Sequence, residues 1–365
     1  YPVDISMNIN LNPIIMRKLK SILGTMAMAS LVFISCERND NDTDTILDIA
    51  SAEEFASIRE QALEDKKQTF QFNADDGAIS LTSEKGVSIY INGSCLKING
   101  ASVTGMVNLE FVEMFDRGDM LTTNKPTMGV MPNGDKALLI SGGEFYLKAT
   151  QGNETIDNDC DMILSIPANL TGGIDNDMVL WKGNIDDKGD LAWNEVRDPN
   201  GNDGVFAEGG NYHTAFGEFG WTNVDRFYSD PRPKTQIQVQ PPAGYDNTNS
   251  SVYLSYDGEG NALAHLDTFD ADLNIFSEHY GQIPVGLECH VIFVSEDDGD
   301  WKYAIKAVTI AANGKYEWNA ANLRTMKHSV NYIAKQLTNN ETVKSSNSCW
   351  YKTRNHKVIE GDFKI

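Results

Sequence analysis

The chain has 365 residues, of which 41% are hydrophobic and 22% are charged, and its formal net charge is -22 at pH 7. These proportions are those of globular proteins, so they exclude wholesale disorder, and the length allows two ordinary domains. The charge argues against nucleic acid as a partner, because phosphate backbones are bound by clustered Lys and Arg. An acidic surface is explained by solubility, with a cation-binding face as the alternative.

A secretion signal is predicted at residues 16–35. It begins with the basic sequence Met-Arg-Lys-Leu-Lys, continues with a largely apolar run over 22–34, and ends at the small residue Ser35. The run is shorter than the ~20 residues that a transmembrane helix needs, and the three-part pattern is typical of a signal peptide. Residues 1–15 carry no targeting pattern and are interpreted as an upstream extension.

The segment 32–36, Val-Phe-Ile-Ser-Cys, resembles a lipobox, with Phe33 in place of the usual leucine. The resemblance implies that Cys36 is diacylated and becomes the first residue of the mature protein; the alternative is an ordinary cysteine after a non-lipid signal. Residues 36–50 are predicted to form an acidic flexible tether. Its stretch 37–44 resembles the tethers of lipoproteins on the outer face of the Gram-negative outer membrane. The sequence thus predicts a lipid anchor in the outer membrane and exposure on the cell surface.

Residues 51–66 predict a short amphipathic helix, which Ser51 and Glu54 begin with a capping box. Beyond it, hydrophobicity alternates with the period of two that is typical of half-buried strands, and Asn-Gly pairs mark tight turns. We therefore expect a mainly β protein with two antiparallel β-sandwich-like domains, the short N-terminal helix and a C-terminal helix over 321–337. The predicted strands include 79–81, 87–91, 107–111, 137–140, 144–148, 161–166, 178–181, 235–239, 252–256, 290–295, 301–310 and 315–318.

A stretch rich in Gly, Asn and Asp follows residue 197, and we place the domain boundary there. The first domain is predicted to be a helix plus a β-sandwich over 51–196, and 197–217 a linker loop. The second, a β-rich domain with the closing helix, is predicted over 218–338. Residues 339–365 are interpreted as a polar tail.

Four cysteines remain besides Cys36, and none belongs to a C-x-x-C pair typical of zinc or redox sites. One or two disulfides can form in an oxidising compartment, but the sequence does not assign the pairing. The four are Cys95, Cys160, Cys289 and Cys349.

Two blocks of sequence resemble segments that occur in the same order in uncharacterised Gram-negative bacterial surface lipoproteins, whose β-sandwich region is distantly similar to that of ankyrins and netrin receptors. The first block comprises 103–113, 119–121, 125–127 and 140–145, and the second comprises 220–228, followed by 283–286. The resemblance spans roughly 75–310 and implies architecture rather than activity. Glu144 stands where the family pattern has methionine, so a buried methionine contact is expected to be missing.

The candidate metal ligands are Asp198, Asn200 and Asn202, because alternating oxygen side chains can converge on calcium at about 2.3–2.6 Å. The alternative for this loop is an ordinary turn. The stretch 184–195 also resembles a calcium loop, but Lys188 occupies a ligand position, which favours a plain hairpin. No cofactor other than this calcium is expected.

Large aromatic side chains suggest either core packing or a face that stacks on sugar rings. They are Trp181, Trp193, Trp221 and Tyr228. Glu208, His213 and Glu218 lack the H-E-x-x-H spacing of zinc proteases, and no serine lies in a G-x-S-x-G elbow. The sequence therefore predicts no catalytic residue.

These observations predict a non-enzymatic cell-surface lipoprotein, a binding or structural module of the outer membrane. Its expected partners are the membrane, through the lipid anchor, and an unknown protein or glycan ligand. The alternative is a hydrolase that acts on glycan or peptide.

Overall fold

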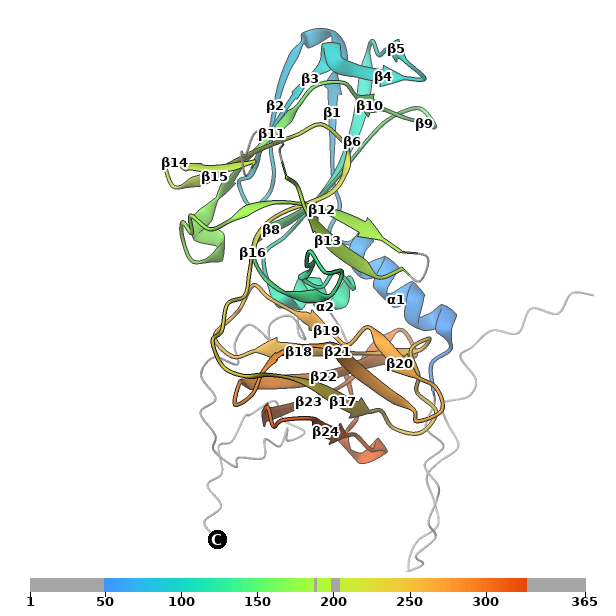
Figure 1. Ribbon diagram of the computed structural model, residues 1–365. Coiled ribbons are helices and arrows are strands. Elements are labelled where there is room, and N and C mark those ends of the chain that lie inside the picture. Colours follow the sequence, from blue (N-terminus) through green and yellow to red (C-terminus); the bar gives the residue numbers. More distant parts are fainter. Residues whose placement is uncertain (1–48, 187–188, 198–203, 327–365) are drawn as a thin grey trace, which may run out of the picture. The chain divides into compact units, whose positions relative to one another are not determined.

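The computed structural model describes residues 49–186, 189–197 and 204–326 (Figure 1). The predicted signal peptide, Cys36, nearly all of the tether and the polar tail lie outside these residues, as do Cys349 and the candidate calcium ligands Asp198, Asn200 and Asn202. The described chain is mainly β, as the sequence predicts.

Helix α1 (Ala52–Glu64) confirms the predicted capping box. The Ser51 hydroxyl accepts a hydrogen bond from the Glu54 amide (3.2 Å), and the Glu54 carboxylate accepts one from the Ser51 amide (2.8 Å). Phe55 and Ala62 are buried, and the Phe55 ring packs edge-on against Trp301 at 6.5 Å. The apolar side of α1 is thereby held against the strands that carry Trp301.

The larger sheet of the first β-sandwich has eight strands. In sheet order they are β1 (Gln68–Asn73), β6 (Met106–Met114), β8 (Lys136–Gln151), β16 (Gly220–Phe227), β12 (Val179–Ile185), β13 (Leu191–Glu195) and β7 (Met128–Val130), and β9 (Glu154–Thr155) pairs with β8. One residue pair joins β7 to β13 in parallel, whereas the other pairings are antiparallel.

A five-stranded sheet packs against it. Its order is β14 (Val205–Glu208), β15 (Asn211–Phe216), β11 (Met162–Pro167), β3 (Ser88–Asn92) and β2 (Ala78–Thr82), and a small sheet comprises β10 (Asp157–Asn158), β4 (Leu96–Ile98) and β5 (Ala101–Ser102). Phe111 and Leu147 of the eight-stranded sheet share one buried cluster with Ile89 and Leu164 of the five-stranded sheet. This is the face-to-face packing of a β-sandwich.

Two further sheets follow along the chain. The first is β20 (Thr268–Asp270), β21 (Ile275–Pro284), β17 (Lys234–Gln240) and β24 (Gly314–Glu317), and the second is β19 (Ala264–His265), β18 (Ser250–Tyr256), β22 (Glu288–Asp297), β23 (Asp300–Thr309) and β25 (Arg324–Met326). Val239 and Phe276 of the first are buried with Val252 and Phe293 of the second. The predicted antiparallel arrangement is again incomplete, because β17 pairs with β24 in parallel.

The predicted linker 197–217 does not separate the sheets. Strands β14 and β15 pair with β11, and β16, which we assigned to the second domain, pairs with β8 and β12. The Gly- and Asn-rich stretch thus lies between strands of one sandwich. Turn-forming residues mark a reversal of the chain, but they do not distinguish a loop inside a domain from a linker between domains.

The predicted C-terminal helix is wrong where the structure can be compared with it. Residues 320–322 form one 3-10 turn, and β25 pairs with Trp301–Tyr303 of β23. Residues 324–326 form backbone hydrogen bonds with strand β23, and this pairing outweighs the helix that the spacing of Leu323 and Met326 predicts. Residues 327–337 lie outside the described part of the chain.

Cys95 and Cys160 form a disulfide, with their Cα atoms 5.6 Å apart. Cys95 ends the 3-10 turn between β3 and β4, and Cys160 lies between β10 and β11, so the bond joins the two connections between the five-stranded sheet and the small sheet. Cys289 is buried and free, and burial raises the pKa of its thiol to about 12.

The three tryptophans belong to a core. Trp181, Trp193 and Trp221 are at most 8% exposed and pack with Met114 and Leu191 on one face of the eight-stranded sheet. The indole N–H groups of Trp181 and Trp193 donate to the carbonyls of Asp225 (2.8 Å) and Pro126 (3.0 Å). Their rings are therefore not a free platform for sugars.

Candidate functional site

The sequence-predicted site residues do not assemble into a reactive site. Within the described ranges, no group of three or more His, Cys, Asp or Glu residues is placed to hold a metal ion. Glu218 pairs with Lys182, whereas the His213 ring stacks on Phe206 at 4.9 Å and lies 3.4 Å from the Glu208 carbonyl. The structure also contains no helix, among the residues it describes, that is long and apolar enough to span a membrane.

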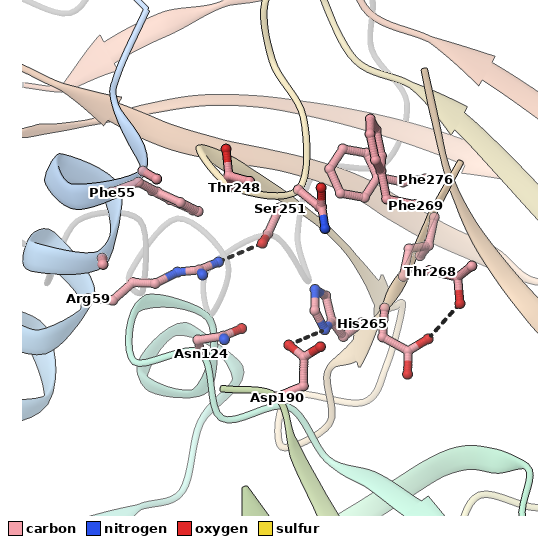
Figure 2. A pocket seen from close by; sticks show the side chains of 15 residues that line it. Phe55, Arg59, Asn124, Asp190, Thr248, Ser251, His265, Thr268, Phe269 and Phe276 are labelled. Atoms are coloured by element: carbon pink, nitrogen blue, oxygen red, sulfur yellow. Dashed lines mark hydrogen bonds and ion pairs between the residues drawn. The ribbon is translucent and has the colours of Figure 1, made fainter. Parts of the chain in front are cut away.

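A cavity of about 470 Å³, which we call the Arg59 pocket, brings together side chains that are far apart in sequence (Figure 2). Helix α1 contributes Phe55 and Arg59, and the loop after α2 (Arg117–Thr122) contributes Asn124. Asp190 immediately precedes β13. The remaining polar wall comes from Ser251 of β18, His265 of β19, and Asp267 and Thr268 at the start of β20.

Arg59 is held in the pocket by neutral groups. Its Nη2 donates to the Ser251 hydroxyl (2.6 Å) and the Tyr253 hydroxyl (3.1 Å), and its guanidinium carbon lies 3.9 Å from the centroid of the Phe55 ring. Phe55 and Arg59 are four residues apart on α1, so they lie on one helical face. The Nε atom of Arg59 is buried and has no hydrogen-bond partner, and no carboxylate of the described residues forms an ion pair with this guanidinium. Among the described residues the guanidinium thus has a donor without an acceptor and no ion-pair partner, and the charge of Asp190 acts on it only at longer range.

The opposite wall carries an unusual carboxylate, Asp190. Among the described residues its carboxylate accepts no hydrogen bond, and the nearest basic side-chain atom is Nδ1 of His265, 3.8 Å from Oδ1. Burial lowers the pKa of His265 to about 3, so its ring is neutral at pH 7 and does not balance the carboxylate. Burial, and then the charges of Asp186 and Asp267, raise the pKa of Asp190, against the longer-range attraction of the Lys136 and Arg59 charges. The environment therefore favours a cationic or hydrogen-bond-donating neighbour for this group.

Asp267, by contrast, is already compensated. Its carboxylate accepts hydrogen bonds from Lys136 (2.7 Å) and from the Tyr280 hydroxyl (3.0 Å). Burial opposes ionisation, but the hydrogen bond and charge of Lys136 outweigh it, and the pKa of Asp267 is lowered. The carboxylate of Asp267 is therefore less available to a ligand than that of Asp190.

The lining of the pocket favours binding over covalent chemistry. Ser251 accepts from Arg59, so its hydroxyl is engaged by a cation rather than by a base. Thr268 does hydrogen-bond to an imidazole, that of His279 (2.8 Å), but this contact is exposed. Phe269 and Phe276 add an apolar wall, with ring centroids 4.8 Å apart. The pocket thus combines a few convergent polar groups with aromatic surface, which is typical of small-molecule sites.

Sequence reasoning identified none of these residues. Arg59, Asn124, Asp190 and His265 come from four separate elements, with no motif or regular spacing. The only signal available was a charged residue, Arg59, one turn after Phe55 and therefore on the apolar face of a predicted helix.

A second buried polar cluster lies inside the eight-stranded sheet. Glu144 pairs with Asn223 across β8 and β16 and is 0% exposed, and neither of its carboxyl oxygens has a hydrogen-bond partner among the described residues. Asn223 accepts from Ser141 (3.0 Å) and donates to Asp225 (2.5 Å). Burial and the neighbouring Asp225 raise the pKa of Glu144 well above its usual range, against the attraction of the Lys125 charge. This carboxyl occupies the position at which the family pattern led us to expect a missing methionine contact.

No protein-family model matches the sequence, and no curated protein matches it significantly. A function for the chain therefore has to be argued from its own residues.

Proposed function

We propose that the chain is a non-enzymatic lipoprotein of the bacterial cell surface whose β-rich body binds a small polar ligand in the Arg59 pocket. The observation that carries this proposal is the unpaired guanidinium of Arg59. The chain has 52 acidic residues against 30 basic ones, so a free arginine charge in a cavity is unexpected on composition alone. Buried charges are ordinarily paired, because desolvation of an unpaired ion costs free energy. A ligand carboxylate would supply the missing partner.

Acetate is the simplest probe of this site. We expect the ¹⁵N NMR signal of the Arg59 Nε–H group in the full chain to shift on titration with millimolar acetate, because a carboxylate that accepts from Nη1 changes the charge distribution of the whole delocalised guanidinium. Arg59→Gln should abolish the acetate-dependent changes. Arg232→Gln is the matched control, since Arg232 already pairs with Asp230. No acetate-dependent change in wild type would contradict binding at this pocket.

A hydrolase remains the second candidate, and the Thr268–His279 hydrogen bond is the one feature of the pocket that favours it. Glycan and peptide substrate panels distinguish the two functions. Reproducible turnover that Thr268→Val abolishes, with acetate binding unchanged, would replace the binding proposal by an enzymatic one.

The surface location rests on the predicted anchor. Cys36→Ala should yield an exported protein that leaves the membrane fraction, because each buried acyl CH₂ contributes about 0.8 kcal/mol to membrane partitioning and several chains act together. The Cys95–Cys160 disulfide supports an oxidising, extracytoplasmic compartment. Cell fractionation with protease shaving of intact cells provides the measurement. A variant that remains membrane-bound would contradict lipidation, and a wild type protected from protease would contradict only the outward orientation.

A further inference from the structure

We propose that the ligand of the Arg59 pocket is a zwitterion, a free amino acid with an apolar side chain, whose carboxylate binds Arg59 and whose ammonium group binds Asp190. This inference rests on the proposed function, because it assigns a ligand class to the same pocket. Its specific basis is that, among the described residues, one cavity holds a guanidinium with no ion-pair partner and a carboxylate whose only such contact is with the His265 ring at 3.8 Å (Figure 2).

The carboxylate end is defined by the guanidinium. Arg59 is oriented by Ser251 and Tyr253, which take one terminal nitrogen and leave the buried Nε without a partner. Both two-bond edges of a guanidinium need Nη2, which Ser251 and Tyr253 occupy, so a ligand carboxylate would accept from Nη1, for which no described residue is an acceptor. The contact with the Phe55 ring restricts the guanidinium further, so less conformational entropy is lost on binding.

The ammonium end is defined by Asp190. Tyr253 links the two ends, since its hydroxyl accepts from Arg59 and its ring stacks at 4.9 Å on His265, whose Nδ1 lies 3.8 Å from Asp190. An ammonium group would give Asp190 both a hydrogen-bond donor and a compensating charge. Asp267 is the less suitable acceptor, because Lys136 and Tyr280 already donate to it.

Charge balance selects the zwitterion over simpler ions. A ligand with only a carboxylate would gain Arg59 but be repelled by Asp190, and a ligand with only an ammonium group would gain Asp190 but be repelled by Arg59. A zwitterion pairs both groups and adds no net charge to a chain that already carries -22. Because these charges lie in a partly dehydrated cavity, each pairing is stronger than it would be in bulk water.

The third part of the ligand is specified by the aromatic wall. Phe269 and Phe276 face the same cavity beyond His265 and Thr268 (Figure 2). An aliphatic side chain placed against them would be removed from water, which stabilises binding by roughly 25 cal/mol for each Å² buried. Leucine therefore serves as the probe.

Isothermal titration calorimetry of the full chain with three compounds tests the assignment. Leucine should bind at least tenfold more tightly than N-acetyl-leucine, which lacks the ammonium charge, or leucinamide, which lacks the carboxylate. Asp190→Asn should reduce leucine affinity to that of N-acetyl-leucine and strengthen acetate binding, because it removes the repulsion between two carboxylates. Arg59→Gln should weaken leucine and acetate alike. Asp272→Asn, an exposed carboxylate in the turn between β20 and β21, is the matched control and should change none of these affinities.

The outcomes distinguish ligand binding at the Arg59 pocket from the assignment of the ligand as a zwitterion. Equal affinity for leucine and N-acetyl-leucine, or leucine binding that Asp190→Asn leaves unchanged, would overturn the zwitterion while acetate binding still supported the pocket. Failure of acetate and all three leucine compounds to bind would overturn both. Unfolding midpoints of the variants, measured in parallel, identify any loss of affinity that comes from misfolding.

Discussion

Replacing both Cys95 and Cys160 by serine is expected to lower the free energy of unfolding by about 4 kcal/mol. The disulfide joins residues 65 positions apart, and the crosslink restricts the unfolded chain far more than the folded one. Cys95 lies beside β4 and Cys160 beside β10, two strands that share only two residue pairs. The buried side chain of Leu96 is the other main attachment of this small sheet to the core.

Urea denaturation of the double variant and the wild type measures the effect. The reductant dithiothreitol should shift the wild-type midpoint toward that of the variant and leave the variant unchanged, which separates the crosslink from the serine substitutions. Coincident midpoints for oxidised wild type and variant would contradict a stabilising bond.

Glu144→Gln is expected to stabilise the protein increasingly as the pH rises. Burial raises the pKa of Glu144, so the folded protein retains this proton at pH values where the unfolded chain, with an ordinary pKa near ~4.3, has lost it. The wild type therefore has the full contribution of this group below the unfolded pKa and loses it progressively above. Glutamine cannot ionise and avoids that loss. The difference should grow by up to about 1.4 kcal/mol per pH unit above the unfolded pKa.

Urea midpoints measured at intervals from pH 4 to pH 8 test this expectation. Asp225 and Lys125 remain in the variant, so their own titration contributes to both curves. Glu154→Gln, an exposed carboxylate on the neighbouring strand β9, should follow the wild type throughout. Parallel curves for Glu144→Gln and wild type would show that the buried carboxyl does not have the raised pKa inferred from its burial.

Local sequence signals predicted the elements better than their connections. The Ser51 capping box and the alternating residues of β3 and β6 depend on neighbours along the chain, and the structure confirms them. Two separate strands are predicted over 137–140 and 144–148, whereas Gly142 and Gly143 form a bulge within the single strand β8. A Cβ on Gly142 would lie 2.8 Å from the Val224 carbonyl, and one on Gly143 would lie 2.6 Å from the Phe145 ring. Both positions therefore need a residue without a Cβ. The need arises from the neighbouring strand and from the Phe145 ring, so a Gly pair in the sequence does not reveal it.

The Arg59 pocket was unpredictable for the same reason. In the part of the chain that the structure describes, Arg59 has no ion-pair partner and Asp190 contacts only the His265 ring. Such a lack of partners can be recognised only when the spatial neighbours are known. A single sequence shows which side chains exist but not which remain unpaired after folding.

The buried thiol of Cys289 can be used to measure local unfolding around strand β22. A maleimide reacts with thiolate, and a side chain that is 0% exposed with a pKa of about 12 offers almost none at neutral pH. Labelling at this position should therefore proceed only from molecules in which β22 has separated from its neighbours. Mass spectrometry of the peptide containing Cys289 would then count those molecules over time, without any engineered probe.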